Sequence, residues 1–588
     1  MKRKIFGEFK EVLKNLYDNK FEYIINTSIM EAGILTLGAF VLEKIFELMM
    51  YFAGIHNVTQ TNFYNILFHP VSLITLIVYI LIMAFIMFFE FSFIVFMIYG
   101  KFNNKNYSVK TILNKSFNSM KSLIGKQFIF FLAYFITMIP IQNLGLNSVL
   151  TQDLYIPKFI TEELLKTPSN AIIFLVAMVI LIYINFRLFF VIPLTIISRK
   201  SLSDSIKESW EITKNHKLEI ILIVLMSEVI FTIVSGIIVF VVIYIFEIIN
   251  SSGNSLILQT LFFTLLQAVF LFFSVMSKLV IVTTLVNIIV DKNEVSNEII
   301  NLESKEKRKF KYFNTFLTIF TISLIIYNGY NIYYTGVNEN VLTIAHRGDV
   351  EYGVENSLEA LEGALKNKAD YVEMDIVMTK DNKFVVLHDF NLKRLAGINK
   401  NIYDMNFDEV VGLEIKQGGF KSHIPSFEEY VKRAKELDVK LLVELKPHGE
   451  EPDNYVDLVI QELKRLGIDK KYKVMSLNKD VIVELNKKEP DIDTGYVIPI
   501  QFGSFNNIAV DFYVIEDFSF SNYLLREAKI ENKNVFVWTI NDKEDMTRYL
   551  QTAVDGIITD NPKMVNDVKK ELKTHNTYFD KVARELEL

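Results

Sequence analysis

Long apolar stretches are the feature that most limits what this chain can fold into. A helix needs about 20 mainly apolar residues to cross the roughly 30 Å hydrocarbon layer of a bilayer. Within the first 340 residues seven stretches reach or approach that length with their flanks: 24–53, 71–99, 127–142, 171–197, 218–249, 256–290 and 315–334. We therefore predict that residues 1–340 form an all-α, multi-pass transmembrane domain of about seven helices.

Composition supports a membrane protein and excludes several kinds of site. Hydrophobic residues make up 51% of the 588 residues and charged residues only 22%, which is too apolar for an ordinary soluble protein. With no cysteine, the chain has no disulfide scaffold, thiolate metal site or cysteine nucleophile. The net charge of −6 is unevenly divided, because residues 1–340 carry 28 basic against 23 acidic residues and residues 341–588 carry 34 against 45. A basic membrane half therefore precedes an acidic soluble half.

The basic residues also predict how the chain crosses the membrane. Lysine and arginine are frequent before the first stretch, in 100–126, in 198–217 and before the last stretch. The connections 54–70 and 250–255 have none, and the connection around 143–170 has only Lys158 and Lys166. Because cytoplasmic loops are enriched in lysine and arginine, we predict a cytoplasmic N-terminus. An odd number of spans then places everything after Tyr334 outside the cytoplasm, so we expect a multi-pass cell-membrane protein with an extracytoplasmic soluble domain.

Four ionisable residues lie deep within the predicted spans, namely Glu90, Arg187, Glu228 and Lys278. Each is about 10–12 residues from the predicted cytoplasmic end of its helix, which places all four roughly 15–18 Å deep. Two acids and two bases at one depth can neutralise one another. We favour structural contacts between helices, with a polar path or headgroup site as the alternative.

From residue 341 onward, short apolar strands alternate with amphipathic helices. Strands are predicted at 341–345, 371–378, 384–387, 440–445, 472–475, 494–498, 512–515, 534–538 and 556–558, and helices at about 357–367, 426–437, 454–466, 478–488, 521–530, 541–551 and 562–573. This alternation predicts an α/β fold, an irregular TIM (β/α)₈ barrel over 341–573 followed by a tail, 574–588. The ninth strand is explained by 379–383, which is too short for a crossover helix and so predicts a hairpin.

Acidic side chains cluster where the predicted strands end, which is where such barrels carry their active sites. Glu373 and Asp375 are two residues apart and so lie on one face of their strand, while Met374 faces away. Glu444 ends a later strand. Three neighbouring carboxylates repel unless a cation lies between them, and oxygen ligands favour Ca²⁺ or Mg²⁺. We predict one divalent cation here, without choosing between the two metals.

Two histidines and two fixed positive charges accompany these acids. His346 and His388 also follow strands, and histidine can act as a general acid or base near neutral pH. Arg347 and Lys446 can bind a phosphate group in a domain that would otherwise repel anions. The set predicts metal-assisted acid–base catalysis on a phosphate ester.

These residues also carry a family resemblance. The motifs His346-Arg-Gly, Glu355-Asn-Ser, Glu373-Met-Asp, His388-Asp, Glu444-Leu-Lys and Val537-Trp-Thr occur in an order that resembles the glycerophosphodiester phosphodiesterase family over about 341–567. The resemblance implies that Glu373, Asp375 and Glu444 bind the metal, that His346 and His388 are the acid–base pair, that Arg347 and Lys446 bind phosphate, and that Glu355 and Trp538 line the glycerol or leaving-group side. Val354 departs from the proline often found there. The apolar half is more weakly similar to the membrane domain fused to such enzymes in some Gram-positive bacteria.

The expected activity is hydrolysis of a glycerophosphodiester to sn-glycerol 3-phosphate and an alcohol. One alternative is a lysophospholipase D-like or C-like phosphodiesterase acting at the bilayer, and another is a transporter with the barrel as its sensor. The expected partners are a small-molecule or lipid-derived substrate and membrane lipids. Nucleic acid is not expected, because the soluble half is acidic.

Overall fold

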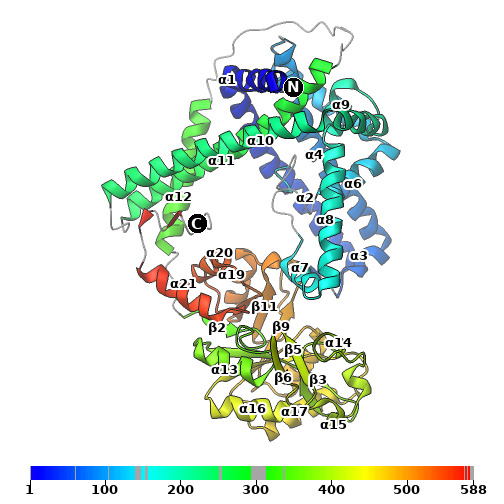
Figure 1. Cartoon of the computed structure of the whole chain (residues 1–588), viewed down its shortest axis with the longest axis vertical. Coiled ribbons are helices and arrows are strands. Elements are labelled where there is room, and N and C mark those ends of the chain that lie inside the picture. The colour runs from blue at the N-terminus through cyan, green and yellow to red at the C-terminus, as the bar shows by residue number, and fades with distance from the viewer. Residues whose placement is uncertain are drawn as a thin grey trace. The chain divides into compact units, whose positions relative to one another are not determined.

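We analysed a computed structural model of the chain, whose elements are labelled in Figure 1. It describes residues 2–59, 61–103, 105–138, 148–151, 156–250, 255–292, 313–334, 338, 340–574, 577–578 and 581–582. The described chain divides into two compact units. The first contains 1–53, 66–156 and 164–332, and the second contains 54–65, 157–163 and 333–588.

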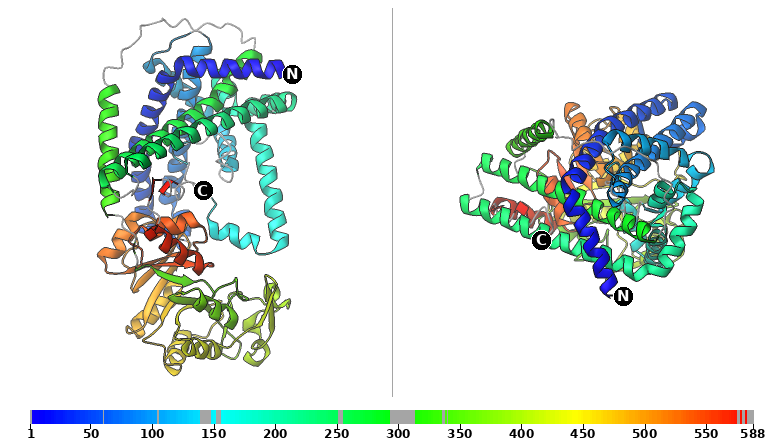
Figure 2. Two further views of the ribbon diagram at one scale, coloured as in Figure 1. Left: turned by 60° about the vertical axis from the view of Figure 1, so that its left-hand side comes forward. Right: turned by 90° about the horizontal axis from the view of Figure 1, so that it is seen from above.

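The first unit is helical. Its helices are α1 (Lys2–Gly33), α2 (Ala39–Ala53), α4 (Pro70–Phe102), α5 (Val109–Ser119), α6 (Lys126–Met138), α8 (Pro168–Leu188), α9 (Val191–Ser198), α10 (Leu202–Ile249), α11 (Leu256–Lys292) and α12 (Phe313–Tyr334). Helix α11 packs on both α1 and α10, and α4 packs on α2, α5 and α9. Two further views show these long helices in blue to green (Figure 2). The predicted long apolar helices of the N-terminal half are confirmed, but Asn57–Thr59 form a short strand, β1, which belongs to the second unit.

Five helical segments among the described residues are long and apolar enough to cross a membrane: Gly7–Ala53, Pro70–Phe102, Pro168–Ser198, Ile220–Ile249 and Leu256–Val290. They coincide with five of the seven predicted spans. At the third predicted span the apolar helix is shorter, Lys126–Thr137, and at the seventh lies α12. The total of seven spans, and the topology that depends on it, stay predictions.

The buried charges of the first unit pair differently from the predicted set of four. Lys278 Nζ lies 2.8 Å from Glu90 Oε1, as expected, and also 2.6 Å from Glu31 Oε1. Arg187 instead places its guanidinium 4.4 Å from the centre of the Trp210 ring. The side chain of Glu228 lies outside the described residues. Direct pairing of Lys278 supports the structural interpretation of this cluster.

The second unit contains a closed barrel of eight parallel strands (Figure 1). In barrel order the strands are β2 (Leu342–Ala345), β3 (Tyr371–Met378), β7 (Lys440–Leu445), β8 (Lys473–Ser476), β9 (Asp493–Ile498), β11 (Phe512–Glu516), β12 (Asn534–Trp538) and β13 (Gly556–Thr559). Around them lie α13 (Leu358–Lys366), α16 (Phe427–Glu436), α17 (Tyr455–Arg465), α18 (Lys479–Lys488), α19 (Asn522–Ile530), α20 (Lys543–Leu550) and α21 (Pro562–Thr574). The predicted TIM barrel is confirmed.

The predicted irregularity is also present. Strand β4 (Phe384–Val386) runs antiparallel to β3, with Met378 opposite Phe384. The chain then forms an insertion with α14 (Lys393–Ala396), α15 (Phe407–Val410) and the hairpin of β5 (Glu414–Gln417) and β6 (Phe420–His423) before α16 begins. Sequence analysis did not predict this hairpin, because its strands are short and largely exposed and lack apolar alternation.

Alternating side chains on the barrel strands fill two apolar layers. Met374 packs in the layer that includes helix residues such as Tyr430, while Ile344 and Leu442 belong to a second cluster made by strand residues. Because successive side chains on a strand point to opposite faces, the burial of Met374 against the helices turns Glu373 and Asp375 inward. The fold thereby aims the acidic residues into the barrel.

Candidate active site

The predicted acidic residues meet inside one end of the barrel. Glu373, Asp375 and Glu444 each offer a carboxylate oxygen, and these oxygens all lie within 4.8 Å of one another. The pairing of β3 with β7 places Asp375 directly opposite Glu444. One oxygen of each carboxylate is buried and has no hydrogen-bond partner within the described part of the chain. Buried polar atoms are rarely left without a hydrogen bond, so three neighbouring carboxylates that each have one such oxygen fit a cation site.

Burial and neighbouring charges shift the pKa values of the three acids in different directions. Burial first, and then repulsion by Asp375 and Glu444, raise the pKa of Glu373 well above its ordinary value. Burial also raises the pKa of Glu444, although Lys446 opposes the shift. For Asp375, Lys446 and Arg347 outweigh the effect of burial and hold its pKa below the ordinary value. A divalent cation would stabilise all three carboxylates in their charged form.

Hydrogen bonds fix two of the three carboxylates. The side chain of Asn356 donates to Asp375 Oδ2 at 2.8 Å and accepts the Asp375 backbone N–H at 3.1 Å. The backbone N–H of Arg347 donates to Glu373 Oε2 at 2.7 Å. Lys446 Nζ lies 3.6 Å from Asp375 Oδ1 and 3.5 Å from Glu444 Oε1. These contacts hold the triad in place, with the Lys446 ammonium beside Asp375 Oδ1 and Glu444 Oε1.

A tight turn after β2 brings Arg347 to the triad. Arg347 has a φ of 56° and Gly348 a φ of 84°, both in the left-handed region. A Cβ on Gly348 would lie 2.7 Å from the backbone of Ala360, so only glycine fits there. Arg347 Nε is buried without a hydrogen-bond partner within the described residues, although it lies 3.5 Å from Asp375 Oδ2. This guanidinium retains a donor for an anionic ligand.

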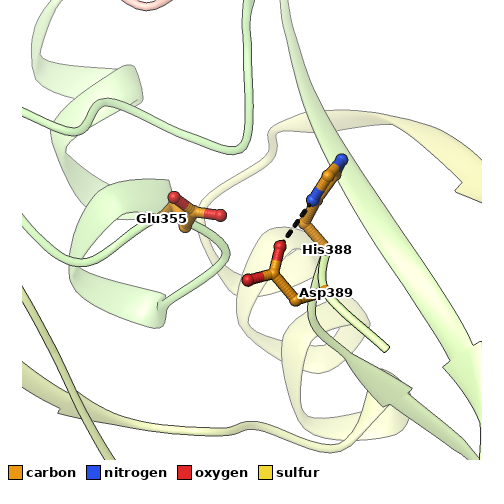
Figure 3. Close-up of side chains that lie close together, drawn as sticks. All are labelled: Glu355, His388 and Asp389. Atoms are coloured by element: carbon orange, nitrogen blue, oxygen red, sulfur yellow. Dashed lines mark hydrogen bonds and ion pairs between the residues drawn. The ribbon is translucent and has the colours of Figure 1, made fainter. Parts of the chain in front are cut away.

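The two histidines are each oriented by a carboxylate. His346 Nδ1 lies 2.7 Å from Asp560 Oδ1, and Asp560 follows the last barrel strand. His388 Nδ1 lies 2.9 Å from Oδ1 of the adjacent Asp389 (Figure 3). When Nδ1 is engaged in this way, the imidazole ring is fixed and Nε2 is the nitrogen that can exchange a proton with a ligand.

Glu355 lies in an ion-pair network and does not project freely toward a ligand. Its carboxylate accepts from Arg347 Nη1 at 3.1 Å and from both terminal nitrogens of Arg394 at 2.9 and 2.5 Å. Arg394 also binds Asp389, so the network continues to His388. Glu355 and Asp389 could also group with His388 around a metal (Figure 3). Because Arg394 already neutralises these two acids, the triad of Glu373, Asp375 and Glu444 fits a cation better.

Trp538 and Val354 both pack against apolar clusters of the barrel domain. The indole N–H of Trp538 donates to the backbone carbonyl of Val514 at 3.2 Å, so only the ring can contact a ligand. Val354 is fully buried in an apolar cluster with Val377 and Leu387. Packing thus holds the loop in which proline was expected.

Sequence analysis missed the residues that support these groups. Asp560 and Arg394 were given no role, and Asn356 and Asp389 were recognised only as parts of motifs. Asp560 could have been found, because it follows a predicted strand like the other site residues. Arg394 lies in the unpredicted insertion and carried no comparable signal.

Each half of the chain matches a known protein family. Residues 9–328 match the family described as "Membrane domain of glycerophosphoryl diester phosphodiesterase", and residues 346–564 match "Glycerophosphoryl diester phosphodiesterase family". A glycerophosphodiester phosphodiesterase of Caldanaerobacter subterraneus is 27% identical over 238 residues, covering 39% of this chain and 98% of that protein. A human lysophospholipase D is 43% identical over 67 residues, covering 11% of this chain and 21% of that protein. A solved glycerophosphodiester phosphodiesterase of Parabacteroides distasonis is 28% identical with a TM-score of 0.35, covering 40% of this chain and 98% of that one.

Proposed function

Because this chain belongs to the glycerophosphoryl diester phosphodiesterase family in its form with a membrane domain, we propose that it hydrolyses a glycerophosphodiester to sn-glycerol 3-phosphate and an alcohol. The observation that supports the mechanism is the cluster of three carboxylates with ligand oxygens within 4.8 Å of one another, each residue having one buried oxygen without a hydrogen-bond partner in the described chain. Glu373, Asp375 and Glu444 would hold one Ca²⁺ or Mg²⁺ ion. When bound, that ion would polarise the phosphoryl oxygens of the substrate.

Two side chains beside the triad can bind the substrate phosphate. Arg347 has an unused donor, and Lys446 lies at the same cluster of carboxylates. Both are buried, and positive charges in a buried site attract a phosphate more strongly than they would in water. We assign Arg347 and Lys446 to orientation of the phosphodiester and to stabilisation of the charge that develops on it.

His346 and His388 are assigned to proton transfer. One histidine removes a proton from the attacking oxygen, which belongs to water or to a glycerol hydroxyl of the substrate itself. Attack by the hydroxyl forms a cyclic glycerol phosphate, and a water molecule must then open that ring to give sn-glycerol 3-phosphate. The other donates a proton to the oxygen of the departing alcohol as the P–O bond breaks. The matched contacts of the two rings, each with a carboxylate at Nδ1, support this pairing. Glu355 and Trp538 are assigned to the glycerol or leaving-group side, with Glu355 acting through the arginines that it binds.

We place this activity at the cell membrane, with a cytoplasmic N-terminus and an extracytoplasmic barrel. The match to a membrane-domain family and the five long apolar helices support membrane insertion. The distribution of lysine and arginine supports the orientation. Tags placed before residue 24 and after residue 582 test this orientation. In vesicles containing the protein, protection of each tag from added protease shows on which side of the membrane it lies.

The test of the activity is a substrate panel with product analysis. Full-length protein in detergent or nanodiscs is incubated with glycerophosphocholine and Ca²⁺ or Mg²⁺, and sn-glycerol 3-phosphate is measured. We expect His346→Ala, His388→Ala and Glu444→Ala each to abolish turnover without loss of folding. Release of phosphocholine instead of sn-glycerol 3-phosphate, or near-normal turnover by any of the three variants, would contradict the proposal.

A second candidate function is hydrolysis of lysophospholipids by a phospholipase D-like reaction. The local similarity to a human lysophospholipase D favours it, as does the link of six residues between Tyr334 and the barrel, which spans about 20 Å at most. Parallel assays with lysophosphatidylcholine in vesicles and with water-soluble glycerophosphocholine distinguish the two. Release of lysophosphatidic acid and choline at the higher kcat/KM would favour the lipid substrate.

A further inference from the structure

The second unit includes two segments that lie, in sequence, between the apolar helices. One is Gly54–Asn65 and the other is Pro157–Glu163. The second segment contains most of helix α7 (Lys158–Leu165). Both contact loops that follow barrel strands at their carboxyl ends, where the acidic triad is located. These contacts belong to no part of the mechanism described so far.

The first segment adds a strand to the barrel rim. Strand β1 (Asn57–Thr59) pairs antiparallel with β10 (Gln501–Gly503), which follows β9. The Asn57 side chain donates to the carbonyl of Ser504 at 2.9 Å. Gly503 has a φ of 92°, and a Cβ there would lie 2.9 Å from the backbone oxygen of His56. The close approach of the two backbones therefore requires glycine at this position.

The second segment binds the loop that follows β12. Lys158 Nζ lies 2.5 Å from Asp542 Oδ2 and also contacts Asp545 Oδ2. Asp542 is the N-cap of α20, because its Oδ1 accepts the backbone N–H of Asp545 at 2.8 Å. One lysine therefore neutralises two acids at the start of this helix and fixes the loop that enters it.

That loop carries Asn541, whose side-chain amide contacts Glu162 in α7 and Asp560, the partner of His346. Asn541 Nδ2 donates to Asp560 Oδ2 at 2.7 Å and to Glu162 Oε1 at 3.4 Å. Its Oδ1 accepts the backbone N–H of Asp560 at 2.9 Å. Asp560 in turn binds His346 Nδ1 at 2.7 Å. A continuous line of contacts thus runs from α7 to the histidine.

We propose that α7 is a positioning element for catalysis: by binding the loop after β12 through Lys158 and Glu162, it holds Asn541 and Asp560 in the arrangement that orients His346. This proposal rests on the proposed function, since it takes His346 to be a proton-transfer group. It makes the membrane half more than an anchor, because a segment between two of its apolar helices completes the support of the active site. The hydrogen-bond network around His388 differs in origin, since Asp389 and Arg394 both lie in the barrel domain.

The test is a double-mutant cycle in the full-length protein with glycerophosphocholine and metal. We expect Lys158→Met to lower kcat about 3- to 30-fold, the range typical of residues that act through a network. KM should be unchanged, because the variant leaves the phosphate-binding groups intact. Asp560→Asn should lower kcat about 10²-fold through loss of the oriented histidine. Adding Lys158→Met to Asp560→Asn should then have little further effect, because both act on the same line of contacts.

Two controls separate positioning from general damage. Lys158→Arg keeps the charge and should retain wild-type kcat. Lys166→Met removes an exposed lysine just after the same helix and should also leave kcat unchanged. An undiminished kcat in Lys158→Met, or an equal loss in the wild-type and Asp560→Asn backgrounds, would overturn the proposal. Failure of the wild-type protein to release sn-glycerol 3-phosphate would instead overturn the proposed function.

Discussion

The two units treat buried charge in opposite ways. In the helical unit, Glu90 accepts from Lys278, from the Ser148 hydroxyl at 2.5 Å and from the Val149 N–H at 3.2 Å. In the barrel, one oxygen each of Glu373, Asp375 and Glu444 has no hydrogen-bond partner within the described chain. A buried charge cluster that is fully hydrogen-bonded stabilises a fold at most modestly, whereas a buried cluster rich in carboxylates without hydrogen-bond partners is a candidate binding site. We therefore interpret the first cluster as structural and propose that the second binds a cation.

The largest expected effect on activity comes from changing the carboxylate triad of the barrel. Glu444→Gln removes one charged metal ligand and should lower kcat/KM by at least about 10³-fold, because metal stabilisation of the transition state is worth several kcal/mol. In metal-free protein the same variant should unfold at a higher temperature, since it relieves repulsion among buried carboxylates. Enzyme assays and thermal unfolding in EDTA measure the two effects. A metal-free variant less stable than wild type would contradict this view of the triad.

Disrupting the buried ion pairs of Lys278 with Glu31 and Glu90 should instead change only the stability of the helical unit. Lys278→Met leaves Glu31 and Glu90 buried without their common cation and should destabilise the helical unit by about 3–5 kcal/mol. Turnover per folded molecule should stay at the wild-type level. Unfolding in detergent, followed by the loss of soluble monomer on size-exclusion chromatography, measures the first effect. A specific loss of turnover in correctly folded Lys278→Met protein would give this cluster a functional role.

Metal binding should stabilise the barrel without stabilising the helical unit. At a free metal concentration 100 times its Kd, the expected gain is about 2.7 kcal/mol, because the metal binds only the folded site. Hydrogen exchange of barrel strands β3 and β7 with and without Ca²⁺ or Mg²⁺ localises the effect. Glu373→Gln serves as the control and should abolish the gain.

The smallest expected effect is a pH dependence of metal-free stability. The folded pKa values of Glu373 and Glu444 are raised above the unfolded value of about 4.3, so the folded state binds more protons in that window. Stability should therefore fall as pH rises through the window, by up to about 1.4 kcal/mol per pH unit for each group. The contribution of Asp375 to stability changes with pH in the opposite direction, because its pKa is lowered in the folded state. The lowered pKa confines that contribution to more acidic pH. Saturating metal should remove the dependence, and urea unfolding at several pH values measures it.

Much of the catalytic half could be predicted because its information is local. Short apolar runs between amphipathic helices identified all nine predicted strands, and strand ends supplied Glu373, Asp375, Glu444 and both histidines. Parallel strands present their carboxyl ends at one edge, so residues at strand ends meet whatever the details of packing. The helical unit was predicted less completely. Hydropathy located its helices, but it carries no information on which faces meet, and Glu31 was missed as the second partner of Lys278.

The sequence by itself determined that apolar helices precede a TIM barrel and which side chains stand at the barrel's catalytic end, because hydropathy and strand periodicity are properties of neighbouring residues. Only the tertiary structure decided which residues these side chains bind. His346 is joined to Asp560 across 214 positions, and Lys158 binds Asp542 across 384. Such contacts depend on how loops from distant elements come together, and no pattern of adjacent residues encodes that geometry.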